Sequence, residues 1–316
     1  MNIDRKDIRI INRYSDLSEK QVDKILKAHV YNSPESWQKF LRLLFISLGI
    51  AFTTAGILFF FAYNWADLHK FIKLGLVEGL IITLTSVVLF SNIKIDIKHI
   101  IITGTAILVG VLFAVFGQIY QTGANAYDFF LGWTIFITLW VVVLNFPPLW
   151  LVFITLVNTT LILYSEQVAH GWSAILLSTL LFSINLLFLV AFIITSKTVE
   201  TIKTPNWFLN IIALATIVFS TIGISISIFE PYELATLVLV SLSVIIYAIG
   251  IIYGLRAKKG FYLSIIPFSV IVICSAFFIK ISVDPGMFFI ISLFIVISVT
   301  LVIRNLINLQ KKWTNE

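Results

Sequence analysis

Residues 43–63 read LLFISLGIAFTTAGILFFFAY and contain no charged side chain. About 20 consecutive apolar residues in a helix are enough to cross the hydrocarbon core of a bilayer. The segment has to be helical there, because backbone N–H and C=O groups left unpaired in hydrocarbon are strongly unfavourable. This stretch therefore predicts a transmembrane helix.

Nine further runs of this kind follow along the chain. The composition agrees, since 59% of the residues are hydrophobic and 12% are charged, roughly half the charge of an ordinary soluble domain. The runs lack the alternation of apolar and polar residues that strands of a membrane barrel need. We therefore predict an all-α, polytopic helical bundle of about ten transmembrane helices. The nine later spans are expected at residues 74–90, 100–116, 129–144, 149–164, 172–195, 207–229, 234–253, 261–279 and 287–303.

The distribution of charge predicts the orientation of this bundle. Cytoplasmic loops of membrane proteins carry an excess of Lys and Arg. With the N-terminus inside, only Lys70, Lys73 and Lys280 of the 22 basic residues fall on the outer face. We therefore expect both termini in the cytoplasm, with a cytoplasmic helical segment at 1–42, the bundle at 43–304 and a cytoplasmic tail at 305–316. The net charge of +6 then reports orientation and contact with anionic lipid, and no nucleic-acid partner is expected.

The cytoplasmic segment at the N-terminus is predicted to form two helices. In SEKQVDKILKAHV, residues 18–30, Ser18 and Gln21 have the spacing of a capping box, and apolar residues recur on one face. Pro34 should start a second helix that continues into the first span. The pair can brace the bundle at the membrane surface or bind a protein partner, and the sequence leaves both interpretations open.

Two pairs of glycines four residues apart lie inside predicted spans. Gly75 with Gly79 and Gly250 with Gly254 have the spacing that lets membrane helices approach closely. We therefore predict close helix contacts at both pairs.

The stretch AVFGQIYQTGANAYDFFLGW, residues 114–133, is rich in polar groups and contains no Lys or Arg. The charge pattern places it on the outer face. Gly117 and Gly123 would allow the chain to dip into the bundle. The alternative is a polar hairpin tip that Tyr120 and Tyr127 anchor at the lipid interface. Both interpretations remain open.

Glu78 is the ionisable residue that lies inside a predicted span and has the strongest claim to a function. A charge at that depth is costly and is a functional hypothesis by default, although a protonated structural carboxyl would also fit. Gln118, Lys73 and Asn64 lie at a suitable depth to be its partners. We predict an outward-facing polar vestibule in the N-terminal half, lined by Asn64, Trp65, Glu78, Gln118, Tyr120, Gln121, Asn125 and Asp128.

Signatures of catalysis and of metal binding are absent from the sequence. The four histidines are scattered, and the single cysteine, Cys274, permits neither an intrachain disulfide nor a thiolate cluster. No P-loop, nucleophile elbow or paired-histidine motif occurs. We therefore expect no cofactor, no metal and no identifiable catalytic residue.

Residues 18–133 resemble a family of predicted bacterial membrane proteins, domain of unknown function 2157. The resemblance rests on SEKQVDKIL, on Trp37 to Leu41, on GILFFFAYNW and above all on FGQIYQTGANAYDFFLGW. It implies a bacterial inner-membrane location and assigns no activity. Where the family usually has an acidic residue after QTGA, this chain has Asn125.

Three functions fit these features. The leading hypothesis is transport of a small polar or ionic solute through the outer vestibule. The second is a non-catalytic membrane scaffold or sensor whose cytoplasmic helices engage a protein partner. The third is a membrane-embedded enzyme acting on envelope substrates, since acid and base candidates exist without a nucleophile.

Overall fold

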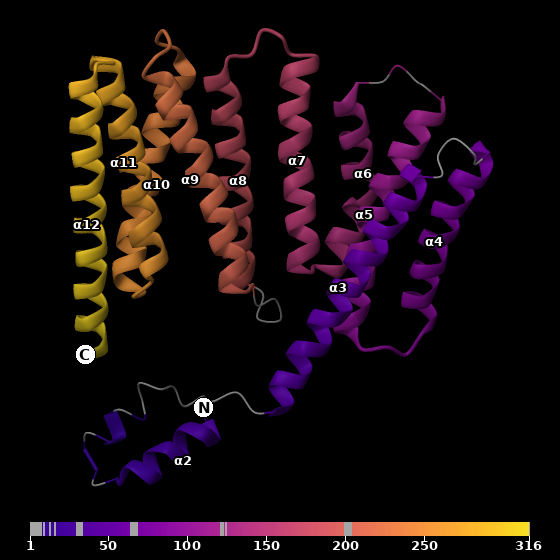
Figure 1. Ribbon diagram of the computed structural model, residues 1–316, viewed down its shortest axis with the longest axis horizontal. Coiled ribbons are helices and arrows are strands. Elements are labelled where there is room, and N and C mark those ends of the chain that lie inside the picture. Colours follow the sequence, from indigo (N-terminus) through magenta and orange to yellow (C-terminus); the bar gives the residue numbers. More distant parts are fainter. Residues whose placement is uncertain are drawn as a thin grey trace. The chain divides into compact units, whose positions relative to one another are not determined.

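The protein consists of helices, and ten of those described are long and apolar enough to cross a membrane. This confirms the predicted all-α polytopic bundle. The chain divides into two compact units, Met1–Gln121 and Thr122–Glu316, and each is considered by itself (Figure 1). The computed structural model describes residues 8, 10–12, 14–15, 17–29, 34–63, 69–120, 123, 125–198 and 204–315.

The first unit is built around one central helix, α5, against which both α3 and α4 pack. Small residues on α5 allow this close packing. An ideal Cβ built on Gly104 would lie 2.5 Å from Ile50 Cγ2 of α3. On the other side, Val77 of α4 is fully buried among Leu108, Val111 and Val115 of α5. The helices of this unit are α2 (Glu19–His29), α3 (Pro34–Tyr63), α4 (Lys70–Phe90) and α5 (Ile95–Tyr120).

Helix α3 begins at Pro34 and continues without a break into the first span, as predicted. Its 30 residues correspond to about 45 Å, longer than the hydrocarbon core of about 30 Å. Lys39 near its start forms an exposed ion pair with Asp96 in the first turn of α5, at 3.5 Å. The first turns of α3 therefore extend beyond the apolar span and lie level with the start of α5.

The predicted capping box at the start of α2 is formed in one of its two arms. The backbone N–H of Ser18 donates to Oε1 of Gln21 at 2.9 Å, as expected. The Ser18 hydroxyl donates to the same oxygen at 3.0 Å. The second arm of the box, a bond from the Gln21 backbone N–H to the Ser18 hydroxyl, is replaced by a bond from this N–H to the Ser18 carbonyl at 2.9 Å.

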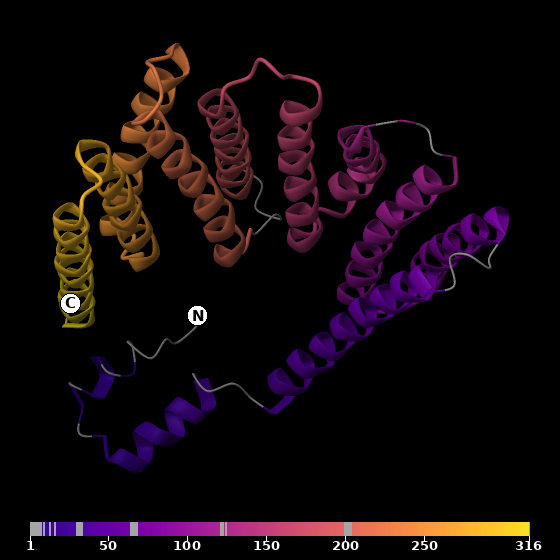
Figure 2. The same ribbon diagram turned by 45° about the horizontal axis from the view of Figure 1, so that its top comes forward.

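In the described part of the second unit, seven helices follow one another in chain order, and α9, α10 and α11 form a three-helix group (Figures 1 and 2). Aromatic side chains hold α7, α8 and α9 together, with Phe192 and Phe208 stacked edge to face at 4.8 Å. The helices are α6 (Ala126–Leu144), α7 (Pro147–Gln167), α8 (Ala174–Thr198), α9 (Asn206–Ser227), α10 (Leu234–Arg256), α11 (Gly260–Ile281) and α12 (Pro285–Asn315).

The two predicted glycine pairs behave differently. Ideal Cβ atoms on Gly250 and Gly254 would lie 2.6 Å from Ile266 and 2.9 Å from Leu263, so the predicted close contact between α10 and α11 is confirmed. Gly75 has no heavy atom of another element near its Cβ position within 4 Å, and Gly79 has none either. Among the described residues, the face of α4 that carries Gly75 and Gly79 is therefore open.

Candidate functional site

Glu78 lies well inside α4. This helix has 21 residues, which correspond to about 31 Å and match the thickness of the hydrocarbon core with no length to spare. Glu78 comes eight residues after Lys70, the first residue of α4, and is therefore about 12 Å along the helix. Glu78 is therefore more than two helical turns from either end of α4.

The side of α4 that carries Glu78 is exposed. Its neighbour Val77 is buried against α5, and successive helical residues are about 100° apart. Glu78 itself is exposed, next to the open positions of Gly75 and Gly79. With the described residues it forms no hydrogen bond or ion pair, so the structure does not bring it together with Gln118.

The last turn of α5 and the first turn of α4 do meet. The Lys70 ammonium lies 6.0 Å from the centre of the Tyr120 ring and 5.3 Å from that of Phe71. Lys73, one turn further along α4, is 8% exposed. Gln118 is exposed. This end of the first unit is therefore cationic and aromatic. Tyr120 contacts Lys70 through the face of its ring.

Asn125 and Asp128 form the start of α6. The backbone N–H of Asn125 donates to Asp128 Oδ2 at 3.1 Å, so the carboxylate caps the helix. The backbone N–H of Tyr127 donates to Oε1 of Gln167 on α7 at 3.0 Å, and its ring packs on Tyr164 at 5.3 Å. The carboxylate of Asp128 therefore has a local structural role.

The polar stretch that joins the third span to the fourth is mostly helical. Its first part is the last turn of α5, and Ala126 begins α6. Gly123 has φ of +65°, a left-handed conformation that favours glycine. Both interpretations of this stretch, a hairpin tip and a loop that dips into the bundle, stay predictions. Asn64, Trp65 and Gln121 of the predicted vestibule lie outside the described residues.

The second unit contains a buried amide pair that sequence reasoning did not connect. Asn185 of α8 is fully buried and donates from Nδ2 to Asn158 Oδ1 of α7 at 2.8 Å. Asn158 donates back to Asn185 Oδ1 at 3.2 Å. Asn185 also donates to the Leu181 carbonyl at 2.8 Å. Interhelical hydrogen bonds of this kind hold membrane helices together, and two asparagines in adjacent spans were the available signal.

A second buried polar group lies among α9, α10 and α11. The Tyr247 hydroxyl is 2.6 Å from Ser220 Oγ and 2.6 Å from Ser269 Oγ. Ser269 Oγ is also 2.6 Å from Thr221 Oγ1. Four hydroxyls from three helices thus form one connected group, which we call the hydroxyl cluster. Sequence analysis missed it, because single Ser and Thr residues are common in membrane helices.

Two acidic residues in the connections of the second unit accept hydrogen bonds from serine hydroxyls. Glu233 accepts a hydrogen bond from the Ser173 hydroxyl at 2.7 Å. Asp284 accepts from Ser282 Oγ at 2.6 Å and from the Met287 N–H at 2.8 Å. These two bonds, the Ser282 bond first, lower the pKa of Asp284 below its ordinary value. Asp284 is therefore an ionised cap at the start of α12.

A metal centre is not formed by the part of the chain that the structure describes, where no three His, Cys, Asp or Glu residues come together. Among the described residues, the polar groups that meet in space are amides, hydroxyls, ion pairs and helix caps. None of these groups supplies the activated nucleophile with an adjacent base that covalent catalysis needs.

Comparison with known proteins bears on the first unit and the start of the second. Residues 15–150 match the family model of a predicted membrane protein (DUF2157). The DUF2157 match runs from the N-terminal segment into α7 and contains all eight residues of the predicted vestibule, but covers less than half of the 316 residues. It confirms the resemblance seen in the sequence. No curated protein and no solved structure matches the chain.

Proposed function

We propose that this protein lies in a bacterial inner membrane with both termini in the cytoplasm, and that α4 borders a water-filled, outward-facing vestibule for a small polar or ionic solute. The observation that carries the proposal is the position of Glu78. Its carboxyl group lies about 12 Å along a helix that has only the length of the hydrocarbon core, on an exposed face.

Lipid is a poor environment for that face. An ionisable side chain in a span is costly unless it meets water, a counter-charge or another polar group. Glu78 has none of these among the described residues, and the glycines beside it leave the backbone accessible. Water along the face of Glu78 satisfies both the carboxyl group and the exposed backbone. Gln118 and Tyr120 at the end of α5 then provide polar groups near the entrance.

Labelling of introduced cysteines tests whether water reaches this face. In a Cys274→Ser background, Glu78→Cys is expected to react with a membrane-impermeant methanethiosulfonate added from outside, because the reactive thiolate forms only where water is present. Leu76→Cys is the matched control, since Leu76 is 50% exposed at nearly the same depth on a different face of α4. We expect labelling at position 78 to be faster by about tenfold or more.

Equal rates at positions 76 and 78, or no reaction at either, would contradict the proposal. The consequence for transport is measured with the full chain in liposomes. Glu78→Gln is expected to change the flux of K⁺, or of urea as a neutral polar probe, relative to the unsubstituted protein. If position 78 is labelled but neither K⁺ nor urea crosses the membrane, water reaches Glu78 without transport, and a sensor function is favoured.

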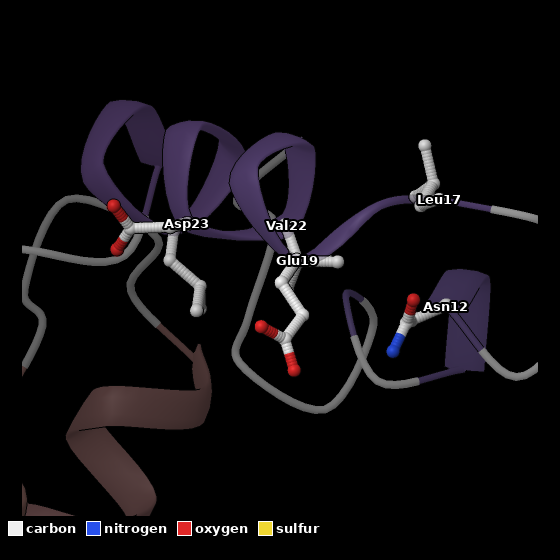
Figure 3. Close-up of a pocket in the computed structure, with 6 residues that line it drawn as sticks. Asn12, Leu17, Glu19, Val22 and Asp23 are labelled. Carbon is white, nitrogen blue, oxygen red and sulfur yellow. The ribbon is translucent and has the colours of Figure 1, made fainter.

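A scaffold or sensor function is favoured by a separate feature of the N-terminal segment. A pocket of about 200 Å³ lies along α2 and is open to solvent. Figure 3 shows Glu19 and Asp23 on successive turns of α2, with Asn12 on a neighbouring segment. Asp23 is already paired with Lys27 at 2.7 Å, which leaves Glu19 and the apolar groups Val22 and Leu26 for a protein partner. Absence of labelling at position 78 would favour this second function.

A further inference from the structure

Helix α12 is longer than its neighbour α11 and extends beyond the first residue of α11. It has 31 residues, whereas α11 has 22, and 22 residues already correspond to about 33 Å. Gly260, the first residue of α11, lies level with Gln310, whose Nε2 is 4.0 Å from the Cβ position of that glycine. Arg304 comes six residues before Gln310, so it is about 9 Å further toward the hydrocarbon.

A groove on α12 surrounds this arginine. It has a volume of about 260 Å³ and is lined by Thr300, Ile303, Arg304, Ile307 and Asn308. Ile303 and Ile307 are 47% and 46% exposed. Ile303 and Ile307 therefore give the groove an apolar side, and Thr300, Arg304 and Asn308 give it a polar side.

The polar side of the groove is cationic. Arg304, Asn308 and Lys311 are spaced four and three residues apart and share one face of the helix. Arg304 has no hydrogen-bond or ion-pair partner among the described residues. The last residue of α10, Arg256, and Lys259 in the connection to α11 add two cations at the same end of the second unit. Residues 250–270 contain no acidic residue, and Glu316 is the one acidic residue in residues 300–316.

We propose that this groove binds one anionic phospholipid, with its phosphate held by Arg304, Asn308 and Lys311 and the upper part of an acyl chain lying along Thr300, Ile303 and Ile307. An apolar wall that ends in unpaired cations has the same amphiphilic pattern as a phospholipid at the boundary of the bilayer. The guanidinium group matches a phosphate through two parallel hydrogen bonds. The depth of Arg304 explains why its counter-ion comes from the lipid, because a cation there is costly without an anion.

Native mass spectrometry of the purified full-length protein tests the site. Phosphatidylglycerol and phosphatidylcholine with the same acyl chains are added in equal amounts. We expect the phosphatidylglycerol adduct to exceed the phosphatidylcholine adduct several-fold. Arg304→Gln should reduce it to the phosphatidylcholine level, and Arg304→Lys should give an intermediate value because the charge remains while the two-bond geometry is lost. Lys280→Gln, at the opposite end of α11, should change nothing.

Three results would overturn the proposal. Equal losses in Arg304→Gln and Lys312→Gln would show diffuse attraction to the cationic surface instead of a groove. Inorganic phosphate that competes fully with the lipid would show a site for the headgroup alone. Equal binding of the two lipids would exclude charge recognition. The site is independent of the vestibule, so labelling at position 78 should be the same in the Arg304→Gln protein.

Discussion

Replacing Gly223 by alanine is expected to destabilise the second unit, because the added methyl group would meet two neighbouring helices. An ideal Cβ on Gly223 would lie 2.5 Å from Leu239 Cδ2 and 2.6 Å from Ser178 Cβ. The leucine can rotate away, but the serine Cβ is fixed to the backbone of α8. Helices α8 and α9 would have to separate, and overpacking of this kind costs about 1–3 kcal/mol. The better helix propensity of alanine returns about 1 kcal/mol, so the net effect is a loss.

Thermal unfolding in detergent measures this loss, and two variants sharpen it. Gly56→Ala on α3 is the matched control, because no atom lies within 4 Å of its Cβ position. It should be neutral or stabilising by up to about 1 kcal/mol. Adding Ser178→Gly to Gly223→Ala should recover part of the lost stability, since it removes the atom that clashes. A Gly223→Ala protein as stable as the unsubstituted one would show that the helices adjust without cost.

The fold was predictable because hydrophobicity alone decides which segments leave water. All ten spans were placed correctly, but their ends were not. The second span was expected from residue 74, whereas α4 begins at Lys70. Long basic side chains can continue a helix at the membrane boundary, because their methylene groups lie in the apolar layer while the charge reaches the surface. A span predicted from hydrophobicity alone excludes such residues and therefore begins too late.

The side of a helix that faces its neighbours could not be predicted in the same way. On α4 apolar residues occur all round the helix, so Val77 and Leu76 are equivalent in the sequence although one is buried and the other is half exposed. The sequence therefore placed Glu78 on the second span without showing which surface of the helix it lies on. In lipid both sides of a span are apolar, which removes the amphipathic signal that guides predictions in soluble proteins.

Partners between helices were the least predictable part of the candidate site. Gln118 was considered as a partner of Glu78, but depth alone cannot say which residues share a face. Asn158 and Asn185 form a reciprocal amide pair, and each was visible in the sequence only as an isolated polar residue. Contacts of this kind depend on how far each helix is rotated, and nothing local in the sequence encodes that rotation.

Tyr247→Phe is expected to give the second large loss of stability, because it removes the central member of the hydroxyl cluster. The contacts close a ring. From Ser220 it passes through Tyr247, Ser269 and Thr221, and Thr221 donates to the Ile217 carbonyl at 2.6 Å. Ser220 also reaches this carbonyl, at 2.9 Å. Four hydroxyl protons serve five contacts, so one contact in the ring lacks a proton at any moment. The hydroxyls of Ser220, Tyr247, Ser269 and Thr221 thus form one connected chain.

Phenylalanine breaks that chain at its centre, because it removes one donor and one acceptor between α10 and its two neighbours. An interhelical hydrogen bond in a membrane contributes about 0.6 kcal/mol on average, so the loss of two should cost about 1–2 kcal/mol when the buried hydroxyls left behind are included. Thermal unfolding with a Ser269→Ala double-mutant cycle measures the coupling, which should be clearly non-zero. Tyr253→Phe on the same helix is the control, because Tyr253 is 47% exposed. Additive effects of Tyr247→Phe and Ser269→Ala would show that the hydroxyls act separately.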